Sequence, residues 1–128
     1  MPGKSHALRV LVVDDEFLIR WSLGEMLAHA GHTVLEAEDG AGAMRALTES
    51  SEPIDAVILD FRLPDSNDLT LLADVRRSSP DSAVIMMTAH GNADMARDAV
   101  GLGAYRVMPK PFDMDEMRVV LAEACGRV

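Results

Sequence analysis

The sequence is poor in cysteine, in basic residues and in long apolar runs, and each shortage excludes a class of protein. Cys125 is the single cysteine among 128 residues, so an internal disulfide is excluded and a reducing compartment is indicated. Twelve lysine and arginine residues stand against 21 aspartate and glutamate residues. The formal charge of −9 argues against direct nucleic-acid binding. No apolar stretch is long enough to cross a bilayer, and the opening MPGKSH lacks the apolar core of a signal peptide. We therefore expect a cytoplasmic protein with no membrane segment.

What the sequence does contain is a regular alternation of apolar strand-like runs and amphipathic helix-like segments. Hydrophobic residues make up 48% of the chain, enough for a packed core, and the length fits one domain over residues 1–128. We expect the core to span about 8–124 and residues 1–7 to be flexible. Strands are predicted over Arg9–Val13, Thr33–Ala37, Ala56–Leu59, Ala83–Met87 and Ala104–Met108. Helices are predicted over Glu16–Ala30, Gly40–Ser50, Asp68–Ser78, Asn92–Gly101 and Met114–Cys125. Five such units predict an α/β fold, a doubly wound five-stranded parallel sheet with helices on both faces.

Polar residues follow the predicted strands at the edge where such a sheet gathers its functional groups. Asp14 and Asp15 follow the first strand and Asp60 follows the third. Thr88 follows the fourth and Lys110 follows the fifth. Three acids, a hydroxyl and an ammonium group are therefore expected to meet at one rim.

Three crowded carboxylates repel one another, and a divalent cation removes that repulsion. Mg²⁺ prefers oxygen ligands and often keeps a phosphate oxygen among them. Asp60 could then act as a nucleophile that forms an aspartyl phosphate. Lys110 would neutralise phosphoryl oxygens and the Thr88 hydroxyl would hydrogen-bond one of them.

The motifs VVDDE, LDFRLPD, MMTAHG and VMPKPF, in this order and at these spacings, resemble the receiver domain of bacterial two-component response regulators. The resemblance covers about Leu8 to Ala124 and implies a flavodoxin-like strand order of 2-1-3-4-5. It implies that Asp60 is the phosphoacceptor and that Mg²⁺ is the cofactor. Mg²⁺ would be held by Asp15, Asp60 and the backbone carbonyl of Arg62, and by Asp14 directly or through water. Thr88 and Lys110 would bind the phosphoryl group, and the Lys110–Pro111 peptide bond would be cis.

By the same resemblance the chain is a signalling switch and not an enzyme, beyond its own phosphorylation and dephosphorylation. The phosphoryl group would come from a sensor histidine kinase. It would change the surface of the segments 92–101, 104–108 and 114–125 and so control an output module, a partner or a homodimer. The stretches GAYRVMPKPFDMDEM and LIRWSL look most like receivers at the front of NtrC-type transcription regulators. Because no ATPase or DNA-binding module lies in these residues, both a fragment and a stand-alone receiver remain open.

Four positions depart from the family pattern or lie near the rim without a fixed role. Val107 stands three residues before the lysine, where the family often has tyrosine or phenylalanine, and Tyr105 lies two residues earlier. His90 stands two residues after Thr88, and Asp68 occupies a position that is often glycine. We expect Val107, Tyr105 and His90 to be modulatory at most.

Two alternatives compete with a receiver. A phospho-aspartate phosphohydrolase of the haloacid-dehalogenase type also arranges aspartate, threonine and lysine around Mg²⁺. It carries its nucleophile in a D-x-D-x-[TV] motif after the first strand, where this chain reads DDEF. A nucleotide-binding module would need a glycine-rich phosphate loop, and neither G-x-G-x-x-G nor G-x-x-x-x-G-K-[ST] is present. Outside the rim, we expect Trp21 to be partly buried packing.

Overall fold

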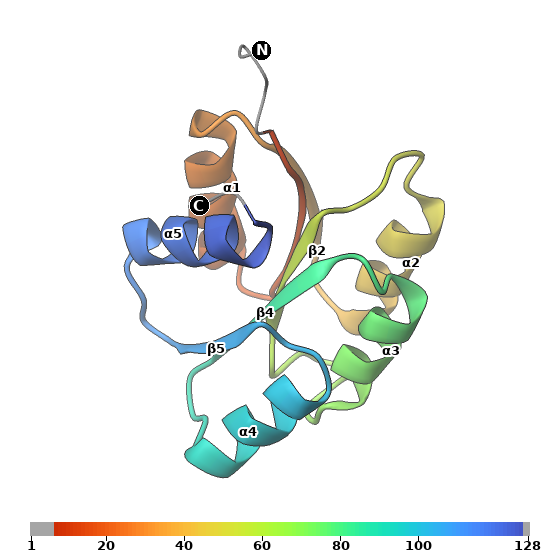
Figure 1. Ribbon diagram of the computed structural model, residues 1–128, viewed down its shortest axis with the longest axis vertical. Helices are drawn as coiled ribbons and strands as arrows, with labels where there is room; N and C mark the ends of the chain where they lie inside the picture. The colour runs from red at the N-terminus through yellow and green to blue at the C-terminus, as the bar shows by residue number, and fades with distance from the viewer. Residues whose placement is uncertain (1–6, 127–128) are drawn as a thin grey trace.

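The computed structural model describes residues 7–126, in which five β-strands alternate with five α-helices (Figure 1). The strands are β1 (Arg9–Val13), β2 (Thr33–Ala37), β3 (Ala56–Asp60), β4 (Ala83–Thr88) and β5 (Arg106–Pro109). The helices are α1 (Phe17–His29), α2 (Gly40–Glu49), α3 (Thr70–Ser78), α4 (Ala93–Gly101) and α5 (Met114–Ala124). The expected flexible start over residues 1–7 lies, apart from Ala7, outside the described residues. Within residues 7–126 no helix combines the length and apolar character needed to span a bilayer.

All five strands are parallel and lie in the order β2-β1-β3-β4-β5. This confirms the doubly wound sheet and the strand order that the resemblance implied. The direction of winding reverses between β1 and β3, which pair from Val10 with Ala56 to Val13 with Leu59. The carboxyl ends of these two strands therefore mark the position where open α/β sheets place functional groups.

Helices cover both faces of the sheet because successive strand residues point to opposite sides (Figure 1). Val10 and Val12 pack with Leu23 and Leu27 of α1 and with the buried face of α5. Leu11 and Val13 belong to the opposite core. There they join residues of α2, α3 and α4: Ala43, Leu71, Leu72, Val75 and Ala99. Burial on both sides explains why the central strand β3 is buried along its whole length and reads as a continuous apolar run.

The boundaries of several predicted elements need correction. β3 and β4 run one residue further than predicted, so Asp60 and Thr88 are the last residues of their strands. β5 begins at Arg106 and not at Ala104, because the Ala104 N–H donates to the Ala99 carbonyl and still belongs to the end of α4. α3 begins at Thr70 and not at Asp68, because the Asp68 carboxylate accepts the Thr70 N–H at 2.9 Å and precedes the helix.

The expectation that Trp21 is partly buried is wrong. Trp21 is 52% exposed, and Phe17 (63%) and Leu18 (71%) are exposed on the same helix, α1. Leu23 and Leu27 form its buried stripe. Because α1 carries apolar residues outside that stripe as well, the sequence pattern did not identify the outward-facing ones.

Candidate functional site

The side chains expected at the rim do meet at one edge of the sheet, at the carboxyl ends of β1, β3, β4 and β5. Asp14 directly follows β1 and is fully buried. Asp60 and Thr88 end β3 and β4 and are 6% and 5% exposed. Lys110 follows β5, where its backbone N–H donates to the Thr88 carbonyl at 2.8 Å, and the Lys110–Pro111 bond is cis, as predicted. Neighbouring parallel strands therefore bring together residues that are up to 96 positions apart in the chain.

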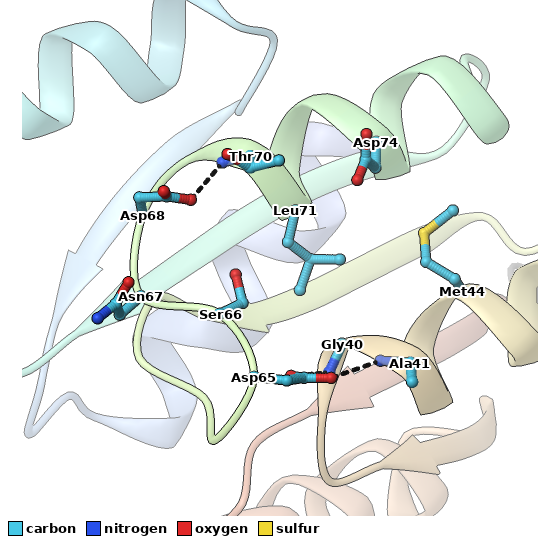
Figure 2. A pocket seen from close by; sticks show the side chains of 10 residues that line it. All are labelled: Gly40, Ala41, Met44, Asp65, Ser66, Asn67, Asp68, Thr70, Leu71 and Asp74. Carbon is cyan, nitrogen blue, oxygen red and sulfur yellow. Dashed lines mark hydrogen bonds between the residues drawn. The ribbon is translucent and has the colours of Figure 1, made fainter.

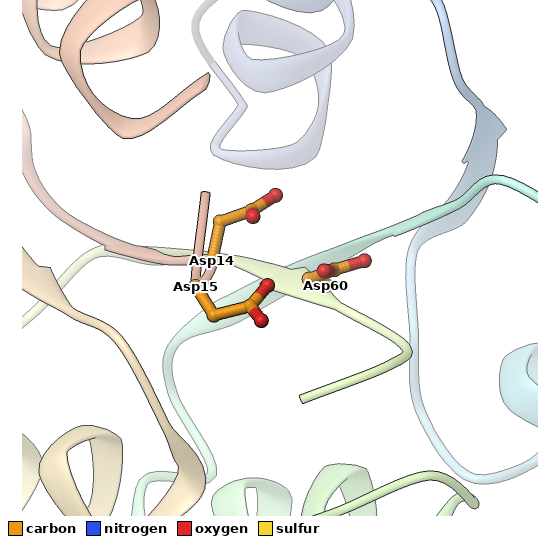
Figure 3. Close-up of side chains that lie close together, drawn as sticks. All are labelled: Asp14, Asp15 and Asp60. Atoms are coloured by element: carbon orange, nitrogen blue, oxygen red, sulfur yellow. The ribbon is translucent and has the colours of Figure 1, made fainter. Parts of the chain in front are cut away.

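Asp14, Asp15 and Asp60 form a group that could hold a metal ion (Figure 3). Each offers one carboxylate oxygen, and these three oxygens all lie within 4.8 Å of one another. Asp15 is exposed, whereas the other two carboxylates are buried, so the group opens to solvent on one side. Oxygen ligands of this kind suit a hard divalent cation that keeps part of its water shell.

The Lys110 ammonium group lies next to the two buried carboxylates of this group. Its Nζ is 2.8 Å from Asp14 Oδ2, 3.3 Å from Asp60 Oδ1 and 3.5 Å from Glu16 Oε1. Burial alone would lower the pKa of Lys110, but the hydrogen bond to Asp14 and the charge of Asp60 raise it overall. The lysine therefore stays charged and partly neutralises the carboxylates.

The positive charge of Lys110 does not fully offset the effects of burial and of Asp14 on the Asp60 carboxylate. Burial, followed by repulsion from Asp14, raises the pKa of Asp60 to about 6, although Lys110 and the backbone N–H of Arg62 act in the opposite direction. The site thus holds more negative charge than its own residues can neutralise. A cation bound between the carboxylates would supply the missing positive charge.

We expect Asp60→Asn to be more stable than the wild type at neutral pH in Mg²⁺-free buffer. The folded pKa of Asp60 exceeds its unfolded value, so its ionised form destabilises the fold above pH 6, and this penalty disappears as pH falls toward 4. After allowance for solvent screening, the variant should gain about 1–2 kcal/mol at pH 7.5. Urea denaturation in EDTA at pH 7.5 and pH 4.5 measures the difference. A variant less stable than the wild type at pH 7.5 would contradict this reading of the site.

Contacts from α1 and β2 fix the conformation of Asp14. Its Oδ1 accepts the Glu16 N–H at 2.8 Å, and Arg20 Nη1 donates to its carbonyl at 2.8 Å. Arg20 in turn pairs with Glu36 at 3.1 Å. Both carboxylate oxygens of Asp14 thus already have protein donors, and Asp60 also meets Lys110 and the Arg62 N–H, which leaves Asp15 the most available direct ligand. Sequence reasoning missed Glu16 and Arg20, although Glu16 directly follows the two aspartates.

Thr88 is held at the mouth of the site by the loop that follows it. Its Oγ1 accepts the His90 N–H at 3.2 Å, while His90 itself is exposed. Gly91 approaches so closely that a Cβ there would lie 2.5 Å from Thr88 Cγ2. Arg62, Ala89 and His90 line the same small cavity as Asp15, Asp60 and Lys110. His90 therefore lies at the mouth of the site.

Val107 lies in β5, which pairs with β4, and Tyr105 directly precedes that strand. Val107 is half-buried and, with Thr88 and Ala96, lines a separate cavity of about 350 Å³. Tyr105 is 43% exposed, and the Arg106 guanidinium lies 5.9 Å from the centre of its ring. None of the described residues that line this cavity is aromatic.

Comparisons with known proteins agree with this geometry. The family model of the response regulator receiver domain matches residues 10–122. DNA-binding transcriptional regulator NtrC of Escherichia coli (strain K12) is 41% identical over 115 residues, which are 90% of this chain and 24% of NtrC. The chain thus spans about a quarter of the length of this relative.

Solved structures show the same fold. A response regulator receiver domain protein from Clostridium thermocellum superposes with a TM-score of 0.85 at 31% identity. The match covers 94% of this chain and 95% of that one. The beryllofluoride-activated NtrC4 receiver domain, solved as a dimer, gives a TM-score of 0.84 at 34% identity over 92% of this chain and 96% of that chain.

Proposed function

This chain belongs to the response regulator receiver domain family, and from that premise we propose that it is a Mg²⁺-dependent phosphoacceptor switch whose Asp60 accepts a phosphoryl group from a sensor histidine kinase. The observation that carries the proposal is the placement of Asp60. It is a buried carboxylate that shares a metal-competent group with Asp14 and Asp15 and lies 3.3 Å from the Lys110 ammonium. Uptake of one phosphoryl group from a small phosphodonor, measured by mass, tests it.

The residues of the rim fit Mg²⁺, because three carboxylate oxygens can converge on one point that is open to solvent. The carboxylates of Asp15 and Asp60 and the backbone carbonyl of Arg62 would hold the ion, with Asp14 beside it directly or through water. When bound, Mg²⁺ would supply positive charge to the phosphoryl oxygens during transfer.

The remaining steps belong to the side chains of the site. A carboxylate oxygen of Asp60 attacks phosphorus, the bond from phosphorus to the kinase histidine nitrogen breaks, and that nitrogen keeps the electron pair. Lys110, now 3.3 Å from Asp60, pairs with a phosphoryl oxygen. Because the Thr88 oxygen already accepts the His90 N–H, its own O–H is free to donate to another phosphoryl oxygen.

The response of the whole regulator is part of the proposal, because the chain spans about a quarter of its curated relative. We propose that the phosphorylated domain acts in the cytoplasm and changes the surface formed by α4, β5 and α5. That surface exposes Val100, Leu102, Tyr105 and Val119. The change would promote self-association, as NtrC4 forms a dimer when activated by beryllofluoride. The strongly acidic chain would not itself bind DNA; any DNA binding would fall to an output domain.

No observation favours the phosphohydrolase alternative. Enzymes of that type carry a D-x-D-x-[TV] motif after the first strand, whereas this chain reads DDEF there, and the matched family is that of receivers. His90 remains a proposed modulator, since it is exposed and touches Thr88 only through its backbone.

We predict that the switch works without a rotating aromatic ring at position 107. Val107 is too short and too stiff about χ1 to sweep between two positions. Tyr105 is two residues back along the chain, about 6–7 Å further from the site. Thr88 and the following loop should therefore move instead, with α4 as a unit. The hydrogen bond from the His90 N–H to Thr88 Oγ1 supports this, because it links the threonine directly to that loop.

Crystal structures with and without beryllofluoride on Asp60 measure this movement. Tyr105→Ala should leave the displacement of Thr88 and residues 89–93 intact, whereas Gly91→Ala should reduce it. A structure in which Tyr105 turns inward while Thr88 and its loop stay in place would refute the prediction.

A further inference from the structure

A single carboxylate ties the loop after β3 to the start of α2. Asp65 Oδ1 accepts the Gly40 N–H at 2.7 Å and Oδ2 accepts the Ala41 N–H at 3.0 Å (Figure 2). Gly40 and Ala41 are the first residues of α2, whose N–H groups have no partner within the helix. The N-cap Asp39 serves a different donor, Gly42, at 2.7 Å. Asp65 therefore completes the end of α2 from 25 residues further along the chain.

The loop and the start of α2 approach each other closely at this contact. A Cβ at position 40 would lie 3.2 Å from Asp65 Oδ1 and 3.2 Å from Leu71 Cδ2, so glycine allows the loop to come this near. The N–H groups of Gly40 and Ala41 lower the pKa of Asp65, so that its carboxylate is charged at neutral pH. A charged acceptor at a helix N-terminus is also favoured by the helix dipole.

Asp65 sits inside a short closed turn. The Leu63 N–H donates to the Ser66 carbonyl at 2.7 Å, and the Ser66 N–H donates to the Leu63 carbonyl at 3.2 Å. Pro64 fixes one backbone angle of this turn, and the Leu63 side chain is buried in the core. The turn thus moves as a unit, and Asp65 connects it to α2.

The residue immediately before this turn is Arg62, whose backbone belongs to the site. Its N–H donates to the Asp60 carboxylate, and the preceding Phe61 N–H donates to the Met87 carbonyl at 2.8 Å. The segment that carries Arg62 is therefore held by β4 on one side and by the turn on the other. If the turn were not fixed in place, only the contact with β4 would hold the direction of the Arg62 carbonyl.

Building on the Mg²⁺-dependent reaction proposed above, we propose that Asp65 is a positioning residue for the metal site: by fixing the Leu63–Ser66 turn to the start of α2, it keeps the Arg62 backbone in the metal-binding orientation. Asp65 does not touch the ion. Without it the turn samples other positions, and the apparent Mg²⁺ affinity falls in proportion to the time that Arg62 spends out of place.

Calorimetric titration of Mg²⁺ into the wild type and three variants tests this. Asp65→Ala should weaken Mg²⁺ binding about tenfold, at the low end of the effect of residues that orient metal ligands. Asp65→Asn should lose less, because its amide oxygen can still accept one N–H. Asp68→Ala is the matched control. Asp68 lies in the same loop and also accepts a backbone N–H, that of Thr70, but it does not reach α2 (Figure 2). The Mg²⁺ affinity of Asp68→Ala should stay within about twofold of that of the wild type.

Nitrogen-15 NMR spectra of the same proteins give a second readout. In Asp65→Ala the amide signals of Gly40, Ala41 and Arg62 should all shift, whereas Asp68→Ala should leave Gly40 and Ala41 unchanged.

The outcomes separate this inference from the proposed function. A wild type that binds no Mg²⁺ would refute the proposed function itself. A wild type that binds normally, together with an Asp65→Ala variant of equal affinity, would overturn the positioning role alone. Equal losses in Asp65→Ala and Asp68→Ala would do the same, since they would point to general loosening of the loop. If Asp65→Ala does not fold, the Asp65→Asn variant is used instead. A variant that has lost the contact with Gly40 but binds Mg²⁺ with unchanged affinity would overturn the positioning role of Asp65.

Discussion

Asp60→Asn is expected to take up no phosphoryl group from acetyl phosphate under conditions in which the wild type is phosphorylated. The amide is nearly the same size as the carboxylate but is a poor nucleophile, and it removes one of the three charges that would hold the cation. Because the variant relieves repulsion in the buried site, its failure cannot be ascribed to unfolding. Radiolabel incorporation over time measures the effect.

Glu38→Gln is the matched control for this loss. Glu38 is an exposed acid that follows β2 at the same edge of the sheet, outside the group formed by Asp14, Asp15 and Asp60. The control should be phosphorylated at the wild-type rate. Uptake by Asp60→Asn at that same rate would remove Asp60 from its proposed role.

Millimolar Mg²⁺ should raise the free energy of unfolding, and Asp15→Ala should abolish most of the gain. Binding to the folded state alone stabilises by about 2.7 kcal/mol when the ion is at one hundred times its dissociation constant. Asp15 is the exposed member of the group and makes it open to solvent, so its loss removes a ligand without leaving a buried hole. Thermal denaturation with Mg²⁺ and with EDTA measures the gain, and Glu38→Ala should retain it.

The gain from Mg²⁺ should also shrink as pH falls from about 7 to 5. Metal and protons compete for the carboxylates, and the pKa of Asp60 is raised to about 6, so Asp60 begins to take up a proton in this range when no ion is bound. A melting temperature that does not respond to Mg²⁺ at any pH would contradict the metal site.

The fold and the convergence at the rim could be predicted because both depend on local patterns and one topological rule. Continuous apolar runs identify buried parallel strands, and parallel strands place their carboxyl ends along one edge. Asp14, Asp60, Thr88 and Lys110 follow from that rule alone. The strand ends at Asp60 and Thr88 were missed by one residue, because a polar residue at the end of a strand can still pair in the ladder.

Contacts between distant loops and helices could not be predicted in this way. Nothing in the sequence says that Asp65 reaches the N-terminus of α2 or that Arg20 donates to the Asp14 carbonyl, because each depends on the distance between separate elements. The exposure of Trp21 could not be predicted from the sequence pattern either. α1 has apolar residues on more than one side, and only its packing against the sheet reveals which of them face outward.

The most direct test of the central claim is the intact mass of the wild-type chain after incubation with Mg²⁺ and acetyl phosphate, followed by mapping of the modified peptide. We predict one added phosphoryl group per chain, carried by the peptide that contains Asp60, and none when EDTA replaces Mg²⁺. A chain of unchanged mass, or a phosphoryl group on a residue other than Asp60, would contradict the account.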